Sequence, residues 1–177
     1  IMNNAQWDAF LERGEYDFSL SIPGKFRYRI NVFRQRQSIA MAMRLIKFNP
    51  PDINTLGLPP IVTSLCGLSR GLILVTGPTG SGKSTSLAAM IDLINNTRNK
   101  HILTLEDPIE YLHKHKKCIV NQREIGLDSA DYSKALRAAL RQAPDIILIG
   151  EMRDLDSLSI VLTAAETGHL VLSSLHT

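Results

Sequence analysis

The stretch from Gly71 to Thr85 limits what this chain can fold into more than any other, and it reads GLILVTGPTGSGKST. Its apolar start predicts a buried strand, its glycine-rich middle predicts a turn, and its end opens a helical pattern. The spacing G-x-x-x-x-G-K-S is that of a phosphate-binding loop. Glycines let successive backbone N–H groups point into one concavity, and the positive end of the following helix attracts anions. We therefore predict that this loop binds phosphate.

The polar residues of the loop each have a chemical role. Lys83 places a cation on the outer phosphates, and the hydroxyl of Ser84 is suited to bind magnesium. The residues expected to contact a phosphorylated nucleotide are Gly77, Pro78, Thr79, Gly80, Ser81, Gly82, Lys83, Ser84 and Thr85. The alternative, a chance glycine-rich turn, is disfavoured because strand, loop and helix all occur in the required order.

The composition fits a folded chain rather than a disordered or membrane-spanning one. Its 177 residues are 44% hydrophobic and 21% charged, which is enough to build a core. No apolar run approaches the roughly 20 residues of a membrane span, and we expect no signal peptide. Cys66 and Cys118 form no CxxC pair, which favours a reducing cytoplasm. The net charge of +3 gives no argument for a nucleic-acid partner.

Residues 1–48 indicate a small α+β unit with a basic face. A helical pattern covers residues 4–13. Three alternating runs predict an antiparallel meander with a turn at Pro23-Gly24, and these runs are Asp17–Ile22, Phe26–Phe33 and Ile39–Ile46. Eight Lys and Arg residues stand against four Asp and Glu residues in this part. Because it is too small for a whole domain, we expect it to be a partial N-terminal domain.

Residues 49–177 predict a second domain of the α/β class. Four prolines, at positions 50, 51, 59 and 60, mark a linker at its start. Strands and helices then alternate, which predicts a mostly parallel sheet covered on both faces. The expected strands are Leu72–Thr76, Ile102–Leu105, Ile119–Asn121, Ile146–Ile149 and Leu170–Leu175. The expected helices are Ser84–Asn95, Ser129–Gln142 and Leu155–Thr167.

Reactive side chains follow three of these strands. Glu106-Asp107, Glu151 and His176 each come directly after an apolar run. In a parallel sheet such groups gather at the carboxyl edge, beside the phosphate loop. Carboxylates that orient a water near bound magnesium are what phosphoryl transfer to water requires. The alternatives are a solvated turn for Glu106-Asp107, an ion pair with Arg153 for Glu151, and an ordinary loop histidine for His176.

Gly150 occupies the position at which the common second nucleotide motif has an Asp. The role of that carboxylate is then shared by Glu151 and the Glu106-Asp107 pair. A glycine at this position also allows the backbone to approach a ligand closely. Several arginines are candidates for reaching a neighbouring subunit's γ-phosphate, each with a solvated surface as the alternative: Arg27, Arg29, Arg34, Arg44, Arg137 and Arg141. His113 and His115 flank Lys114 without partners at metal-ligand spacing, so we predict no metal site there.

Four ordered motifs resemble those of one protein family. They are GPTGSGKST at 77–85, ILTLEDPIEY at 102–111, DIILIGEMRD at 145–154 and TGHLVLSSLHT at 167–177. These are similar to the Walker A, Asp box, Walker B and His box of the type II/IV secretion ATPase superfamily, in which Gly150 before Glu151 is normal. The segments KCIVNQRE, GEMRD and AAETGH resemble the PilT-type retraction ATPases of type IV pili. The resemblance covers nearly the whole chain, including FRYRINVF in the N-terminal part.

The resemblance implies a RecA-like P-loop NTPase core at 49–177, without its C-terminal part, after a partial PAS-like α+β domain at 1–48. It implies a homohexameric ring that hydrolyses ATP with Mg²⁺. Carried over by position, Lys83 binds phosphate, Ser84 and Glu151 bind magnesium, and Glu106 and Glu151 act in hydrolysis. His176 and His169 belong to the box that couples the nucleotide state to movement.

The implied function is ATP-driven pilus retraction at the cytoplasmic face of the inner membrane. The implied partners are an inner-membrane platform protein and the pilin machinery. The resemblance implies that the protein associates with the membrane only by binding these partners. A pilus-assembly or type II secretion ATPase is one alternative, which two CxxC pairs beyond Thr177 would indicate. A nucleic-acid translocase is another, although aromatic residues suited to base stacking are lacking. A non-hydrolysing regulator is a third, against which Glu106 and Glu151 speak.

Overall fold

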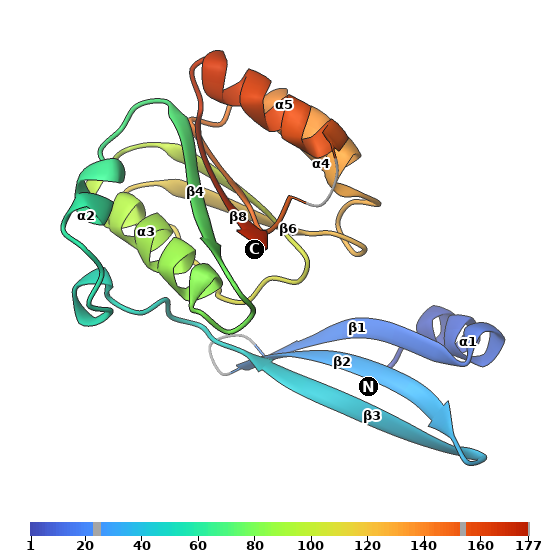
Figure 1. Cartoon of the computed structure of the whole chain (residues 1–177). Helices are drawn as coiled ribbons and strands as arrows, with labels where there is room; N and C mark the ends of the chain where they lie inside the picture. Colours follow the sequence, from blue (N-terminus) through green and yellow to red (C-terminus); the bar gives the residue numbers. More distant parts are fainter. Residues whose placement is uncertain (23–25, 153–154, 177) are drawn as a thin grey trace. The chain divides into compact units, whose positions relative to one another are not determined.

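The computed structural model describes residues 1–22, 26–152 and 155–176, with the side chain of His176 excepted (Figure 1). The predicted turn at Pro23-Gly24 and the side chain of Arg153 lie outside the described residues. The chain divides into two compact units, Ile1–Phe48 and Asn49–Thr177. Each unit has its own hydrophobic core, and the division falls just before the first linker proline.

The first unit is one helix packed on a three-stranded antiparallel sheet. Helix α1 (Asn4–Arg13) begins with a capping box and ends where Gly14 adopts the left-handed conformation. The strands follow in chain order as β1 (Glu15–Ile22), β2 (Phe26–Gln35) and β3 (Ser38–Ile46). The predicted helix and meander are therefore confirmed, with each strand extended by one or two residues. The core consists of Phe10, Phe18, Ile30 and Val32.

The basic face of this sheet is partly paired within the unit. Nε of Arg29 lies 3.9 Å from Oδ1 of Asp17, and Arg27 donates to the hydroxyl of Ser19 at 3.5 Å. Both contacts bring β2 together with β1, the strand next to it. The face is thus less open than the sequence pattern indicates.

Strand β3 carries an apolar stripe that remains exposed. Met41 pairs in register with Val32, and Met43 pairs with Ile30, so the stripe lies on the same face as the core. The stripe residues Ile39, Met41, Met43 and Leu45 are nevertheless 48–55% exposed. Helix α1 therefore covers this face over β1 and β2 and leaves the face of β3 open.

The second unit is a parallel sheet with helices on both faces (Figure 1). Its five described strands lie in the order β4-β8-β7-β5-β6, and all neighbours are parallel. Their bounds are β4 (Gly71–Gly77), β5 (His101–Glu106), β6 (Ile119–Glu124), β7 (Ile146–Ile149) and β8 (Leu170–His176). Strand β7 is buried at all four positions because both faces are covered, which accounts for its unbroken apolar run.

Three helices cover the sheet, α3 (Lys83–Thr97) on one face and α4 (Tyr132–Leu140) with α5 (Leu155–Glu166) on the other. Helix α4 is shorter than the predicted Ser129–Gln142. Asp131 caps its start by accepting a hydrogen bond from the backbone of Lys134, and Ala143 is left-handed shortly after its end. No helix in the described parts of the chain is long and apolar enough to cross a membrane.

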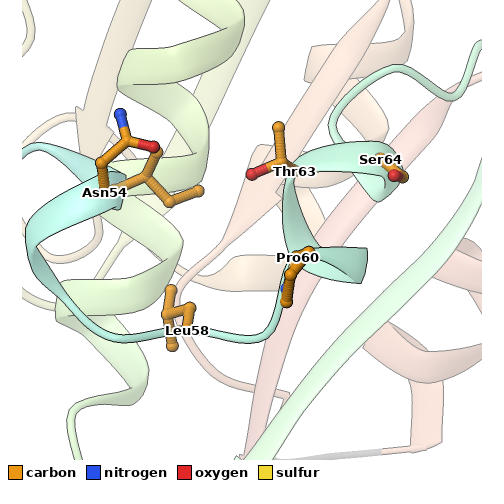
Figure 2. A pocket seen from close by; sticks show the side chains of 6 residues that line it. Asn54, Leu58, Pro60, Thr63 and Ser64 are labelled. Carbon is orange, nitrogen blue, oxygen red and sulfur yellow. The ribbon is translucent and has the colours of Figure 1, made fainter.

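Two short elements that the sequence did not indicate lie in the predicted linker and directly after it. They are the 3₁₀-helix η1 (Ile53–Thr55) and the helix α2 (Ile61–Leu65). A pocket of about 360 Å³ lies between them, with Asn54 and Thr63 on opposite sides (Figure 2). It is lined by Ile53, Asn54, Leu58, Pro60, Thr63 and Ser64. None of these is a predicted site residue, and none is charged.

Candidate active site

The phosphate loop lies where the sequence predicts it, between the end of β4 and the start of α3 at Lys83. Gly77, Gly80 and Gly82 have φ angles of 149°, 80° and 94°. Residues with a Cβ atom rarely adopt these backbone conformations, so the loop depends on glycine at these positions. A Cβ on Gly77 would also lie 2.8 Å from Oγ of Ser81. A side chain at Gly77 would therefore require a strained backbone and a shift of Ser81.

Lys83 lies across this loop. Its Nζ donates to the carbonyl oxygens of Gly77 at 2.8 Å and Pro78 at 3.0 Å. The ammonium group is thus held against the loop at the N-terminus of a fifteen-residue helix. A helix N-terminus with a cation beside it is an arrangement suited to binding an anion such as phosphate.

The next two hydroxyls of α3 contact the segment that follows β5. Oγ of Ser84 donates to Oε1 of Glu110 at 3.1 Å, and Oγ1 of Thr85 lies 3.2 Å from the hydroxyl of Tyr111. Glu110 and Tyr111 are not among the predicted site residues, although both lie in the run that follows a strand at the carboxyl edge. The structure thus places the carboxylate of Glu110 directly beside the hydroxyl expected to bind magnesium.

The carboxylate of Glu106 is hydrogen-bonded to side chains of β5 and β6, and its described contacts do not include the phosphate loop. Its carboxylate accepts hydrogen bonds from Oγ1 of Thr104 at 2.7 Å and from Nε2 of Gln122 at 3.1 Å. Burial raises its pKa, and hydrogen bonds from Thr104, Gln122 and the backbone of Glu110 oppose that shift. The sequence predicted Glu106 as a carboxylate acting in hydrolysis. The structure shows a half-buried group occupied by internal contacts, while Glu110 contacts Ser84.

Gly150 packs against the end of β5 and against Tyr132 of α4. A Cβ at this position would lie 3.3 Å from the hydroxyl of Tyr132 and 3.4 Å from Cα of Glu106. Its carbonyl oxygen accepts from the hydroxyl of Ser174 on β8 at 2.6 Å. This close packing brings Glu151, the next residue, to the same edge as the end of β5. Glu151 is half-buried, and the alternative for it, an ion pair with Arg153, lies outside the described residues.

The two predicted histidines lie at opposite ends of β8. His176 pairs in register with Gly77 at the loop edge, and its side chain lies outside the described residues. His169 precedes the first residue of β8, and its carbonyl accepts from the backbone of Gly71 at the start of β4. Its Nδ1 lies 3.0 Å from the carbonyl oxygen of Ala164 in α5. His169 therefore lies at the amino end of the parallel strands, and the length of β8, about 20 Å, separates it from the phosphate loop.

The candidate arginines divide between the two units. Arg137 and Arg141 are exposed on or next to α4 in the second unit. In the first unit, Arg29 pairs with Asp17, and the guanidinium of Arg34 lies 5.6 Å from the centre of the Phe10 ring. Arg29 and Arg34 thus have structural contacts of their own within the first unit.

These features define a P-loop protein of the α/β class, with a phosphate loop and three acidic residues, Glu106, Glu110 and Glu151, at the carboxyl edge of a parallel sheet. Within that class, the chain belongs to the type II/IV secretion system protein family, whose model matches residues 15–177. This agrees with the superfamily that the four motifs indicate.

Two relatives that match the whole chain are named for type IV pilus retraction and for twitching motility. The type IV pilus retraction ATPase PilT of Pseudomonas aeruginosa is 53% identical over 177 residues, covering 100% of this chain and 52% of that protein. The twitching motility protein of Neisseria gonorrhoeae is 47% identical over 177 residues, covering 100% of this chain and 47% of that protein.

A solved structure confirms the fold. The crystal structure of the pilus retraction motor PilT with bound ADP matches with a TM-score of 0.96 and 55% identity, covering 100% of this chain and 52% of that chain. The predicted α/β class and the resemblance to the PilT type are therefore confirmed. The chain spans about half the length of these relatives.

Proposed function

We propose that this chain is the nucleotide-hydrolysing part of a type IV pilus retraction ATPase. The observation that carries the proposal is the 3.1 Å contact between Ser84 and Glu110, because it places a carboxylate beside the phosphate loop. The 53% identity to PilT supports the particular motor class. In this proposal residues 1–48 are part of a PAS-like domain, and residues 49–177 are a RecA-like ATPase domain.

In this site the loop binds the phosphates of ATP. Its backbone N–H groups cradle the phosphate oxygens, and Lys83 offsets the charge of the outer phosphates. Mg²⁺ fits the hydroxyl of Ser84 and the carboxylate of Glu151, since oxygen atoms are its preferred ligands, and it would offset further phosphate charge. Glu110 and Glu151 are the carboxylates that orient or deprotonate the attacking water, which takes the γ-phosphoryl group and releases ADP.

The working protein is proposed to be a homohexamer at the cytoplasmic face of the inner membrane. Its partners are the inner-membrane platform protein and the pilin machinery, and it takes no nucleic acid. Arg137 and Arg141 are exposed and are candidates for reaching a neighbouring site. The backbone register supports a coupling role for His176, and the position of His169 argues against placing it in the site.

Three substitutions in the full-length protein test the mechanism. Lys83→Ala is expected to abolish nucleotide binding, because it removes the cation at the loop. Glu110→Gln and Glu151→Gln are expected to keep nucleotide binding and to lower phosphate release by about 100-fold or more. Glu166→Gln, an exposed position at the end of α5, is the matched control and should keep full turnover. Near-normal turnover of both Glu110→Gln and Glu151→Gln would overturn the proposal.

The direction of the motor is tested in cells that carry type IV pili. A retraction motor disabled by Glu151→Gln leaves pili on the surface that cannot be withdrawn, so surface pilin should rise and twitching should stop. An assembly motor disabled in the same way would leave the cells without pili. Loss of pili would therefore favour the assembly alternative.

A further inference from the structure

The side chain of Gln122 connects the sheet to the loop that carries Glu110. Gln122 lies on β6, and its Nε2 donates to the carbonyl oxygen of Tyr111 at 2.9 Å and to Oε1 of Glu106 at 3.1 Å. Its Oε1 accepts from the backbone N–H of His113 at 2.7 Å. One amide group thus fixes the loop backbone at two points and joins it to the carboxylate at the end of β5.

Glu106 holds the same loop from the neighbouring strand. Its carboxylate is fixed by Thr104 at 2.7 Å and Gln122 at 3.1 Å. It also takes a backbone hydrogen bond from Glu110. We call Glu106 and Gln122 the loop clamp. The clamp reaches the backbone at residues 110, 111 and 113, which surrounds the two side chains that contact α3.

On its other side, the loop after β5 contacts the start of α3 through two side chains. Glu110 meets the hydroxyl of Ser84 at 3.1 Å, and the hydroxyl of Tyr111 lies 3.2 Å from Thr85. The loop is therefore held between the sheet and the start of α3. A shift of its backbone would move Glu110 relative to the bound phosphates, and a displacement of about 1 Å is enough to slow a reaction about 100-fold.

We infer that Gln122 and Glu106 are positioning residues that hold Glu110 in line with the phosphate loop. The inference rests on the proposed hydrolytic function of that loop. Only an amide serves at position 122, because the site requires two donated hydrogen bonds and one accepted bond. A carboxylate there would donate none of them and would lie next to the carboxylate of Glu106.

Substitutions at position 122 of the full-length protein test this inference. Gln122→Ala is expected to lower kcat for phosphate release by about 10- to 100-fold. The Kd for ATP should stay the same, because Lys83 and the loop glycines are untouched. Gln122→Glu, although nearly identical in shape, should be slowed at least as much as Gln122→Ala, since it adds a like charge and removes both donors. If Gln122 only filled space, Gln122→Glu would keep a higher kcat than Gln122→Ala.

Asn121→Ala is the matched control. Asn121 is the next residue on β6, and its side chain points to the other sheet face, where Nδ2 lies 3.0 Å from Nε2 of His101. It should keep both kcat and Kd. Equal slowing of Asn121→Ala and Gln122→Ala would overturn the inference, because the effect would then belong to β6 as a whole. Unchanged kcat in Gln122→Ala would overturn it as well.

Hydrogen–deuterium exchange provides a readout that does not depend on hydrolysis. Gln122→Ala should speed exchange of the amide of His113 and its neighbours in the loop, and Asn121→Ala should leave it unchanged. Unaltered exchange in Gln122→Ala would contradict the clamp directly. If the wild-type protein failed to hydrolyse ATP, the proposed function would fall, whereas faster loop exchange in Gln122→Ala would still establish the clamp itself.

Discussion

The buried ring of His113 should lower the free energy of unfolding at acidic pH. Its Nδ1 is buried and has no hydrogen-bond partner among the described residues. Burial lowers the pKa of its ring from 6.5 to about 4, while Asp92 opposes the shift and Lys116 adds to it. The folded chain therefore keeps this ring neutral under conditions in which the unfolded chain protonates it.

The sign of the pH effect follows from that difference. The contribution of His113 is fully present above about pH 6.5 and is lost as the pH falls towards 4, because only the unfolded state then takes up the proton. From pH 7.5 to pH 5, about 2 kcal/mol of unfolding free energy should be lost through this ring. Urea unfolding of the wild type and His113→Gln at both pH values measures it. The variant should lose less than the wild type, and equal losses would contradict the prediction.

At the scale of single residues, the sequence predicts what is local. The loop from Gly77 to Ser84 could be located because its function depends on contiguous backbone and one spacing. Glu110 could not, because its contact with Ser84 arises only when the loop after β5 folds back onto α3. The inward direction of Glu106 depends on a partner, Gln122, which lies 16 residues further along the chain on the next strand, β6.

Among the elements, α3 anchors the segment that leads into β6 through one buried amide. Asn95 is 0% exposed, and its Nδ2 donates to the carbonyl oxygen of Lys114 at 2.7 Å. Its Oδ1 accepts from the backbone N–H groups of Lys116 at 3.2 Å and Cys118 at 3.3 Å. A single side chain thus satisfies three backbone groups of a segment without regular structure.

Asn95→Ala should therefore destabilise the protein by about 3 kcal/mol, because buried backbone groups lose their partners. Asn96→Ala is the matched control. Asn96 is exposed and, among the described residues, its side chain bonds only to Asp92 in its own helix, at 2.7 Å and 2.8 Å, so its removal should cost about 0.5 kcal/mol or less. Urea unfolding of the two variants checks the difference. Similar destabilisation of both would show that the anchor is not specific to Asn95.

The elements themselves were largely predictable, and their arrangement was less so. The apolar run of β7 and the alternation of strands and helices predicted a covered parallel sheet, because such runs need burial on both faces. The order of the strands depends on contacts between distant segments and could not be derived. Helix α2 was missed because five residues between Pro60 and Cys66 carry too little periodicity to indicate a helix.

For the molecule as a whole, we expect the exposed stripe on β3 to promote association of this chain in solution. Ile39, Met41, Met43 and Leu45 lie on one face of an edge strand, and each is close to half exposed. An apolar face on an edge strand with free backbone groups favours association with other chains. We therefore expect the 177-residue chain to self-associate as its concentration rises.

Lysine substitutions separate the apolar face from the free strand edge as the cause of that association. Met41→Lys adds a charge to the stripe, whereas Ala42→Lys adds the same charge at the exposed neighbouring position on the opposite face. If the stripe drives association, light scattering across a concentration series should show that Met41→Lys keeps the chain monomeric and Ala42→Lys does not. Both positions are exposed, so urea unfolding should shift by about 0.5 kcal/mol or less in either variant. Equal suppression by both would mean that the backbone edge of β3 drives the association, since a lysine on either face hinders pairing of that edge.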